Sequence, residues 1–169
     1  PIAVEGRGAL ALPQGDWNSG VSINTGYGYG FNIRMQVLPL ISVYGGWDRY
    51  SFGTSGSGNA DASDAGMHLG GQISLPIAWL TGVSPFAFAG AVFNRTEMPV
   101  GSSAVTTESD REIGYEVGAG LAFPFVPAVT LTPQIRYRSH GAEFSAGAGE
   151  RIDTTVSYLS FDIGVRLGI

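Results

Sequence analysis

The sequence predicts an all-β protein, an eight-stranded antiparallel up-and-down β-barrel that spans a membrane. The first sign is the segment Val21–Val37, in which apolar and polar side chains alternate without a break, as in a strand whose two faces meet different surroundings. This run is far longer than an ordinary globular strand of about 5–6 residues, whereas a tilted strand needs about 9–11 residues to cross a bilayer. Two further signs are that the alternation recurs in seven other segments, and that short and long connections take turns between them.

Each alternating segment predicts one strand, and four of them lie in the amino-terminal half. In the first, Ile, Val and Leu alternate with Ala, Glu and Arg; the second is the run described above. In the third, Ile, Val and Trp alternate with Ser, Tyr and Asp, and in the fourth Met, Leu and Ile alternate with His, Gly, Gln and Ser. These predicted strands are residues 2–12, 21–37, 41–48 and 67–75.

The carboxy-terminal half continues the pattern with four more strands. The fifth sets Phe and Val against Ala and Arg, and the sixth sets Ile, Tyr, Val, Leu and Phe against Glu and Gly. The seventh sets Val, Leu, Ile and Tyr against Thr, Gln and Arg, and the eighth sets Leu, Phe, Ile and Val against Tyr, Ser, Asp, Gly and Arg. These strands are residues 86–95, 112–123, 129–138 and 158–167.

The connections differ in character at the two ends of the predicted barrel. Short or nearly uncharged turns with long polar loops at the opposite end are typical of outer-membrane barrels, whose short turns face the periplasm. An even number of strands then places both termini in the periplasm and the long loops outside the cell. The short turns are residues 38–40, 76–85 and 124–128, and the long, mostly acidic loops are residues 13–20, 51–66, 97–111 and 141–153.

Composition narrows the function classes. The chain has 169 residues without a break in composition, so we expect one domain over residues 1–169. It has no cysteine, which excludes disulfides and thiolate metal sites. All nine basic residues are Arg, and 14 acids give a formal net charge of −5, which argues against a nucleic-acid partner. We expect no cofactor and no bound metal.

The polar face of the strands is rich in Gly, Ala and Ser and lacks Lys, unlike the water-facing surface of a soluble domain. A soluble, lipocalin-like barrel would turn its apolar face inward. We instead expect the apolar face to meet lipid, because small residues suit the narrow interior of an eight-stranded barrel. The residues predicted to face lipid are Tyr27, Tyr29, Phe31, Ile33, Phe86, Phe88, Tyr115 and Phe161.

The same face assignment collects charges of both signs in the lumen. They can be read as a charge-lined conduction path or as a plug of Arg–carboxylate pairs, and the narrow interior favours the plug. Counting from the last short turn places Glu116 opposite Arg136, and closure of the barrel brings Asp162 and Arg166 near Glu5 and Arg7. The predicted lumen network is Glu5, Arg7, Arg34, Asp48, Arg95, Glu112, Glu116, Arg136, Arg138, Asp162 and Arg166.

Four short motifs give the chain a likeness to a known family. They are residues 12–16 (LPQGD), 114–120 (GYEVGAG), 131–137 (LTPQIRY) and 158–164 (YLSFDIG). In order and spacing they resemble small bacterial outer-membrane barrels of the outer membrane protein A/X and opacity-protein type. The resemblance implies the fold, a bacterial outer-membrane location and insertion by the barrel-assembly machinery. Such barrels usually end on an aromatic residue, whereas this chain ends on Ile169.

Candidate catalytic residues are few. Ser139 and His140 invite comparison with lipid A deacylase barrels, but neighbouring strand residues point to opposite faces and cannot easily share a proton. His68 has no second His at ligand spacing, so we interpret it as a hydrogen-bonding residue of the lumen. Acidic residues of the long loops, among them Asp61, Asp64 and Glu108, suit solvated loops or cation bridges to lipopolysaccharide. We expect no enzymatic activity.

We therefore expect a plugged outer-membrane barrel that serves envelope structure and surface interaction through its long loops. One alternative is a small pore or conduit for small or apolar solutes, and another is a lipid-modifying enzyme. Expected partners are outer-membrane lipid or lipopolysaccharide and the barrel-assembly machinery. The apolar outer wall also allows self-association.

Overall fold

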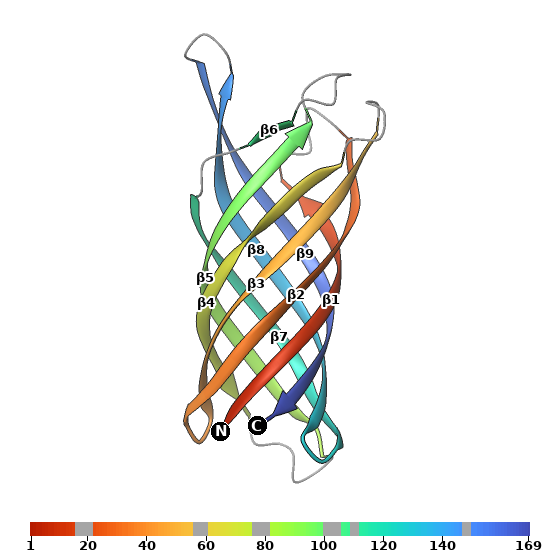
Figure 1. The fold of residues 1–169 in the computed structure, drawn as a ribbon, viewed down its shortest axis with the longest axis vertical. Helices are drawn as coiled ribbons and strands as arrows, with labels where there is room; N and C mark the ends of the chain where they lie inside the picture. Colours follow the sequence, from red (N-terminus) through yellow and green to blue (C-terminus); the bar gives the residue numbers. More distant parts are fainter. Residues whose placement is uncertain (16–21, 56–60, 76–81, 100–105, 109–111, 147–149) are drawn as a thin grey trace.

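The structure is a computed structural model, and it describes residues 1–15, 22–55, 61–75, 82–99, 106–108, 112–146 and 150–169. Eight long strands and one short strand make up a single sheet (Figure 1). In chain order they are β1 (Ile2–Gln14), β2 (Ser22–Leu38), β3 (Ile41–Ser55), β4 (Ala62–Ser74), β5 (Ser84–Pro99), β6 (Thr106–Glu108), β7 (Glu112–Val126), β8 (Val129–Ala146) and β9 (Glu150–Gly168). No helix among the described residues is long and apolar enough to cross a membrane.

The sheet closes on itself, because β1 pairs with β9 and β4 pairs with β5. All pairings are antiparallel, and the short β6 pairs with the end of β5. The prediction of a closed, eight-stranded antiparallel barrel is confirmed. Both termini lie at the same end of the barrel, beside the turns that join β2 to β3 and β7 to β8 (Figure 1).

The register fixes the shape of the barrel. From Val4, the chain of paired residues passes through all eight long strands and returns to β1 at Gln14. This stagger of ten positions makes the strands tilt by about 40° and leaves an interior just wide enough for side chains. Residues two positions apart on one strand therefore contribute to successive layers of the lumen.

The outer wall is apolar. Six of the residues predicted to face lipid lie on it with about half of their surface exposed: Tyr27 60%, Tyr29 55%, Phe31 49%, Ile33 54%, Tyr115 53% and Phe161 51%. The inner face instead holds the charged residues, such as Glu5 and Asp48, both 0% exposed. This distribution is that of a barrel whose apolar side meets lipid.

Phe86 and Phe88 correct the sequence interpretation, because both point into the lumen with 3% and 7% of their surface exposed. The residues that alternate with them on β5, such as Ala87 and Ala89, are also apolar and lie outside. Hydrophobic alternation therefore could not decide which face of β5 points inward. Arg95 follows the same correction: it was expected in the lumen and lies exposed on the outer wall.

The long alternation of β2 also contains a break. The pairing of β2 with β3 shifts between Ile23 and Gly26, so that Asn24 and Thr25 are both exposed and Ile23 turns inward. One extra residue in a strand reverses the facing of everything beyond it. The unbroken pattern predicted from Val21 onward is thus wrong at Ile23, which is 7% exposed.

Several strands run further than predicted. β3 and β4 extend into the segment 51–66, and β8 and β9 extend into the segment 141–153, both of which were expected to be loops. In these extensions several inward residues are apolar, for example Phe52, Ala62 and Ala142, each no more than 1% exposed, and Asp64 is a buried charge among them. Apolar residues thus interrupt the polar-inside pattern that marks the rest of the barrel, and the sequence interpretation ended the strands too early.

We predict that Phe31→Arg destabilises the barrel by about 2–4 kcal/mol, because a charge near the bilayer midplane on the lipid side is poorly solvated. Tyr27→Arg, on the same face of β2 but nearer its end, should cost only about 0–1 kcal/mol. Urea unfolding of the protein in phospholipid vesicles measures both. Equal costs would contradict the placement of Phe31 deeper in the lipid-facing wall than Tyr27.

Candidate functional site

The middle of the lumen is organised around Asp48. Its neighbours on β3, Trp47 and Arg49, belong to the outer face, so alternation turns the Asp48 carboxylate inward. Arg138 crosses from β8 and donates two hydrogen bonds, Nη1 to Oδ1 at 2.7 Å and Nη2 to Oδ2 at 2.8 Å. Arg7 adds a third bond from Nη2 to Oδ2 at 2.6 Å. This bidentate arrangement is the strongest form of Arg–carboxylate pairing.

Glu116 on β7 forms the second centre. Its Oε2 accepts hydrogen bonds from Arg138 Nη2 at 2.6 Å and from Arg136 Nη1 at 2.9 Å, and its Oε1 accepts one from Tyr44 OH at 2.8 Å. Arg138 therefore joins the two centres, since it bonds to both Asp48 and Glu116. All of these side chains are buried.

The register between β7 and β8 differs from the predicted one by two residues. Glu116 lies directly opposite Arg138, while Arg136 lies opposite Gly118 and reaches Glu116 diagonally. Arg136 also approaches Asp162, with 3.4 Å between Nε and Oδ2. The expected contact between Glu116 and Arg136 is thus made, although the two residues are not cross-strand partners.

The end of the lumen beside the termini holds Glu5. It is paired in register with Arg166, whose Nη2 lies 2.8 Å from Glu5 Oε2, and Arg34 Nη2 lies 3.7 Å from the same oxygen. The guanidinium carbons of Arg34 and Arg166 lie 5.9 Å and 5.6 Å from the ring centre of Phe86. The inward turn of Phe86 thus gives this end of the lumen a cation–π surface.

Asp64 was expected among the acidic residues of the long loops, and the structure instead buries it inside β4. Its carboxylate accepts hydrogen bonds from Asn94 Nδ2 at 2.7 Å, Thr96 Oγ1 at 3.1 Å and Tyr158 OH at 2.8 Å. His140 Nε2 lies 3.2 Å from its Oδ1. The sequence carried a signal for this placement, since Asp64 has the same parity on β4 as His68.

The two histidines both serve the lumen. His68 contacts Asn32 through Nε2 and lies 3.3 Å from Asp48 Oδ2 through Nδ1. His140 contacts Asp64 and Thr96 inside the barrel, whereas Ser139 pairs with Tyr115 in an outward row. The geometry therefore gives no proton-sharing pair between Ser139 and His140. Among the described residues, no group of three or more His, Cys, Asp or Glu side chains could hold a metal ion.

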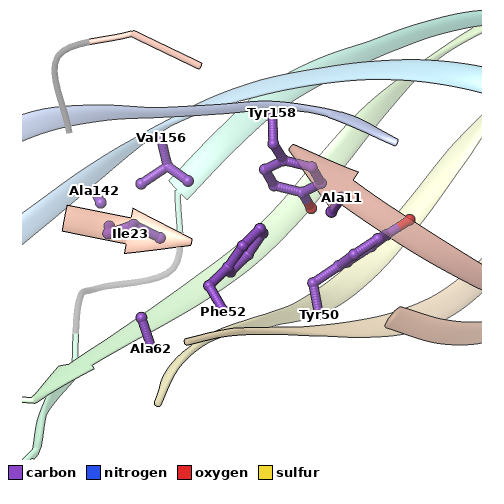
Figure 2. Close-up of a cluster of buried hydrophobic side chains, with 8 residues drawn as sticks. All are labelled: Ala11, Ile23, Tyr50, Phe52, Ala62, Ala142, Val156 and Tyr158. Atoms are coloured by element: carbon purple, nitrogen blue, oxygen red, sulfur yellow. The ribbon is translucent and has the colours of Figure 1, made fainter. Parts of the chain in front are cut away.

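An apolar cluster fills the lumen beyond Asp64, toward the end with the long connections (Figure 2). Tyr158 is its centre: its ring lies 4.9 Å from that of Tyr50 and 5.4 Å from that of Phe52, between ring centres. Arg138 borders the cluster, 5.6 Å from the ring centre of Tyr50. The cluster consists of Ala11, Ile23, Tyr50, Phe52, Ala62, Ala142, Val156 and Tyr158.

Glycines on neighbouring strands make room for the lumen aromatics. Tyr44 lies across Gly70 and Gly90 on its way to Glu116, and a Cβ at Gly90 would lie 2.8 Å from the Tyr44 hydroxyl. A Cβ at Gly28 would collide with ring atoms of Tyr50. The same relation holds for Gly26 with Phe52, Gly118 with Phe88, and Gly120 with Phe86.

Glu112 stands apart from the lattice that the predicted network places it in. It is half-buried at the mouth that faces the long connections, where it lines an open cavity of about 550 Å³ together with Asp153 and Thr154. The described ion pairs do not include it. Among the described residues, the lumen lattice consists of five Arg and five carboxylates: Arg7, Arg34, Arg136, Arg138 and Arg166 with Glu5, Asp48, Asp64, Glu116 and Asp162.

Comparison with known proteins agrees with this architecture. Residues 5–168 match the sequence model of the outer membrane protein beta-barrel domain. Neisserial surface protein A is similar with a TM-score of 0.77 and 17% identity, over 99% of this chain and 97% of that one. OprG from Pseudomonas aeruginosa is similar with a TM-score of 0.64 and 8% identity, over 99% of this chain and 96% of that one. Outer membrane protein W of E. coli is similar with a TM-score of 0.60 and 13% identity, over 98% of this chain and 97% of that one. A search of the curated proteins gives no significant match. At these identities the likeness concerns the fold.

We predict that Gly28→Ala destabilises the barrel by about 1–3 kcal/mol, because the added methyl overlaps the Tyr50 ring. The cost should shrink when Tyr50→Leu is already present. Gly8→Ala is the matched control: a Cβ there meets nothing within 4 Å, so its effect should stay within about 0.5 kcal/mol. Urea unfolding gives all four values, and an equal cost of Gly28→Ala with and without Tyr50 would contradict the proposed packing.

Proposed function

The chain belongs to the outer membrane protein beta-barrel domain family, and on this premise we propose that it is a closed barrel of the bacterial outer membrane that serves envelope structure and surface interaction. The termini face the periplasm, and the long connections face the outside of the cell. The protein performs no enzymatic reaction. Its specific contacts are made by the outer wall and the long connections, because the lumen is filled.

The observation that carries this proposal is the double closure of the lumen. Arg138 and Glu116 meet in the middle with no exposed surface, and Tyr158 and Phe52 close the space beyond them, also 0% exposed. A conducting pore needs a continuous water path along its axis. Here an ion would have to displace paired charges and then an apolar cluster.

The extended strands support a role at the cell surface. β8 and β9 pair up to Ala146 and Glu150, and in Figure 1 this hairpin rises above the neighbouring strands at the end opposite the termini. The pairing therefore carries the strands of this hairpin beyond the rest of the sheet. We propose that such elements carry the surface contacts, while lipid, the assembly machinery and other copies of the chain meet the outer wall.

A conduit for small or apolar solutes is the second candidate. It is favoured by the cavity of about 550 Å³ at the mouth facing the long connections, whose lining includes Ala142 of the apolar cluster. A solute held there would still have to part the side chains of Tyr158 and Phe52. Uptake of an apolar solute into vesicles containing the protein, absent from empty vesicles, would favour the conduit.

We predict that the protein gives little or no steady conductance in planar bilayers, because side chains occupy the lumen. The double variant Asp48→Ala with Arg138→Ala removes a balanced pair from the middle, but its conductance should also stay low, because Tyr158 and Phe52 still close the lumen. A porin in the same bilayers is the positive control. Large, long-lived open states of the unaltered protein would refute the proposed closure.

A further inference from the structure

Among the side chains that the structure describes, two arginines face outward instead of into the lumen. Arg49 on β3 and Arg95 on β5 are both exposed, and both are in register with Ala65 on the strand between them. They therefore stand on one face of the barrel, in one row, two strand spacings apart, which is about 9–10 Å between their backbones. The side chain of Ala65, which lies between them in the row, is small.

This row marks the point at which the outer wall changes from apolar to polar. The next outward row toward the termini contains Trp47, Met67 and Phe93, which are also in register with one another. The next row in the opposite direction contains Ser51, Ser63 and Glu97. Such a change is the boundary between hydrocarbon and headgroups on a membrane barrel.

Aromatic side chains also lie beside this change from apolar to polar residues. Tyr29 is the partner of Arg49 on β2, and its ring contacts Trp47 edge to face with 6.1 Å between ring centres. Tyr and Trp at a lipid boundary are typical of the interfacial belt of membrane proteins. Because the strands tilt, Arg95 lies further from the termini than Arg49, and the two arginines lie around the level at which the headgroups of the lipid leaflet begin.

We propose that Arg49 and Arg95 bind the phosphate of an outer-leaflet glycolipid over Ala65, with the acyl chains lying along Trp47, Met67 and Phe93. Arginine suits this ligand because its planar guanidinium donates paired hydrogen bonds to phosphate oxygens. The net charge of the whole chain is −5, so general attraction by the protein does not account for anion binding here. The site rests on the proposed orientation, with the termini in the periplasm.

Glu97 is a carboxylate on this face among the described residues, and it defines the control. It lies one outward row beyond Arg95, and its Oε2 accepts a hydrogen bond from Ser63 Oγ at 3.2 Å. The phosphate therefore belongs to the arginine row and not to the serine row. Removal of the Glu97 charge should leave the binding intact.

The test is a titration of the detergent-solubilised full chain with diphosphorylated lipid A, followed by native mass spectrometry. Arg49→Gln and Arg95→Gln should each weaken binding about tenfold, the loss expected for one charge-assisted contact. Ala65→Leu should weaken it similarly, because it fills the space while both charges remain. The Glu97→Gln variant should bind diphosphorylated lipid A at least as tightly as the unaltered chain does. Dephosphorylated lipid A should bind to the unaltered chain less tightly than the diphosphorylated form.

The proposal is overturned if the double variant Arg49→Gln with Arg95→Gln binds lipid A as the unaltered chain does. It is also overturned if inorganic phosphate displaces the lipid at equal concentration, since the site would then recognise a soluble anion. Heat-modified gel mobility confirms that each variant is folded. Micelles have no inside or outside, so this result is independent of orientation, which protease treatment of intact cells tests separately.

Discussion

The pairing of arginines with carboxylates inside the barrel is the constraint on which the rest of the structure depends. A charge in so narrow a lumen is poorly solvated, and loss of one partner of a buried pair costs about 3–5 kcal/mol. Arg138 bonds to both Asp48 and Glu116, so it links β3, β7 and β8 across the lumen. Because β3 and β8 lie far apart in the sequence, the contact between Asp48 and Arg138 stabilises the closed barrel and not merely one hairpin.

The shape of the interior follows from that lattice. Each long lumen side chain needs space that a neighbouring strand must leave free, and glycines such as Gly28, Gly90 and Gly118 leave it. The aromatic rings that fill this space then contact the guanidinium groups, as Phe88 does with Arg136 at 4.9 Å. Because side chains fill the interior, we infer that other molecules bind at the outer wall and at the ends of the strands.

Much of this fold could be predicted from the sequence, because period-two alternation marks a strand and its faces wherever the two faces differ in polarity. The prediction was wrong where they do not differ: Phe86 alternates with alanines, so its inward direction had no signal. It also missed the upper lumen, where the inner face is apolar at Phe52. The predicted strands ended before this region, so Asp64 fell in a predicted loop. Arg95 lies on the same strand as Phe86, so its predicted face was wrong as well. The partner of Glu116 was counted from a turn over residues 124–128, whereas β7 continues to Val126 and pairs with Val129, so the partner lies two residues further along, at Arg138.

The most direct test of the lattice is a double-mutant cycle between Glu116 and Arg136, measured by urea unfolding in lipid vesicles. If the two side chains share the buried contact of 2.9 Å, Glu116→Gln should destabilise the barrel, and Arg136→Met in that background should recover part of the loss. The coupling free energy should then lie within about 0.5–3 kcal/mol. Asp61→Asn, at an exposed position, should change stability by less than about 0.5 kcal/mol. Additive effects of Glu116→Gln and Arg136→Met would contradict the claim that paired charges in the lumen hold the barrel together.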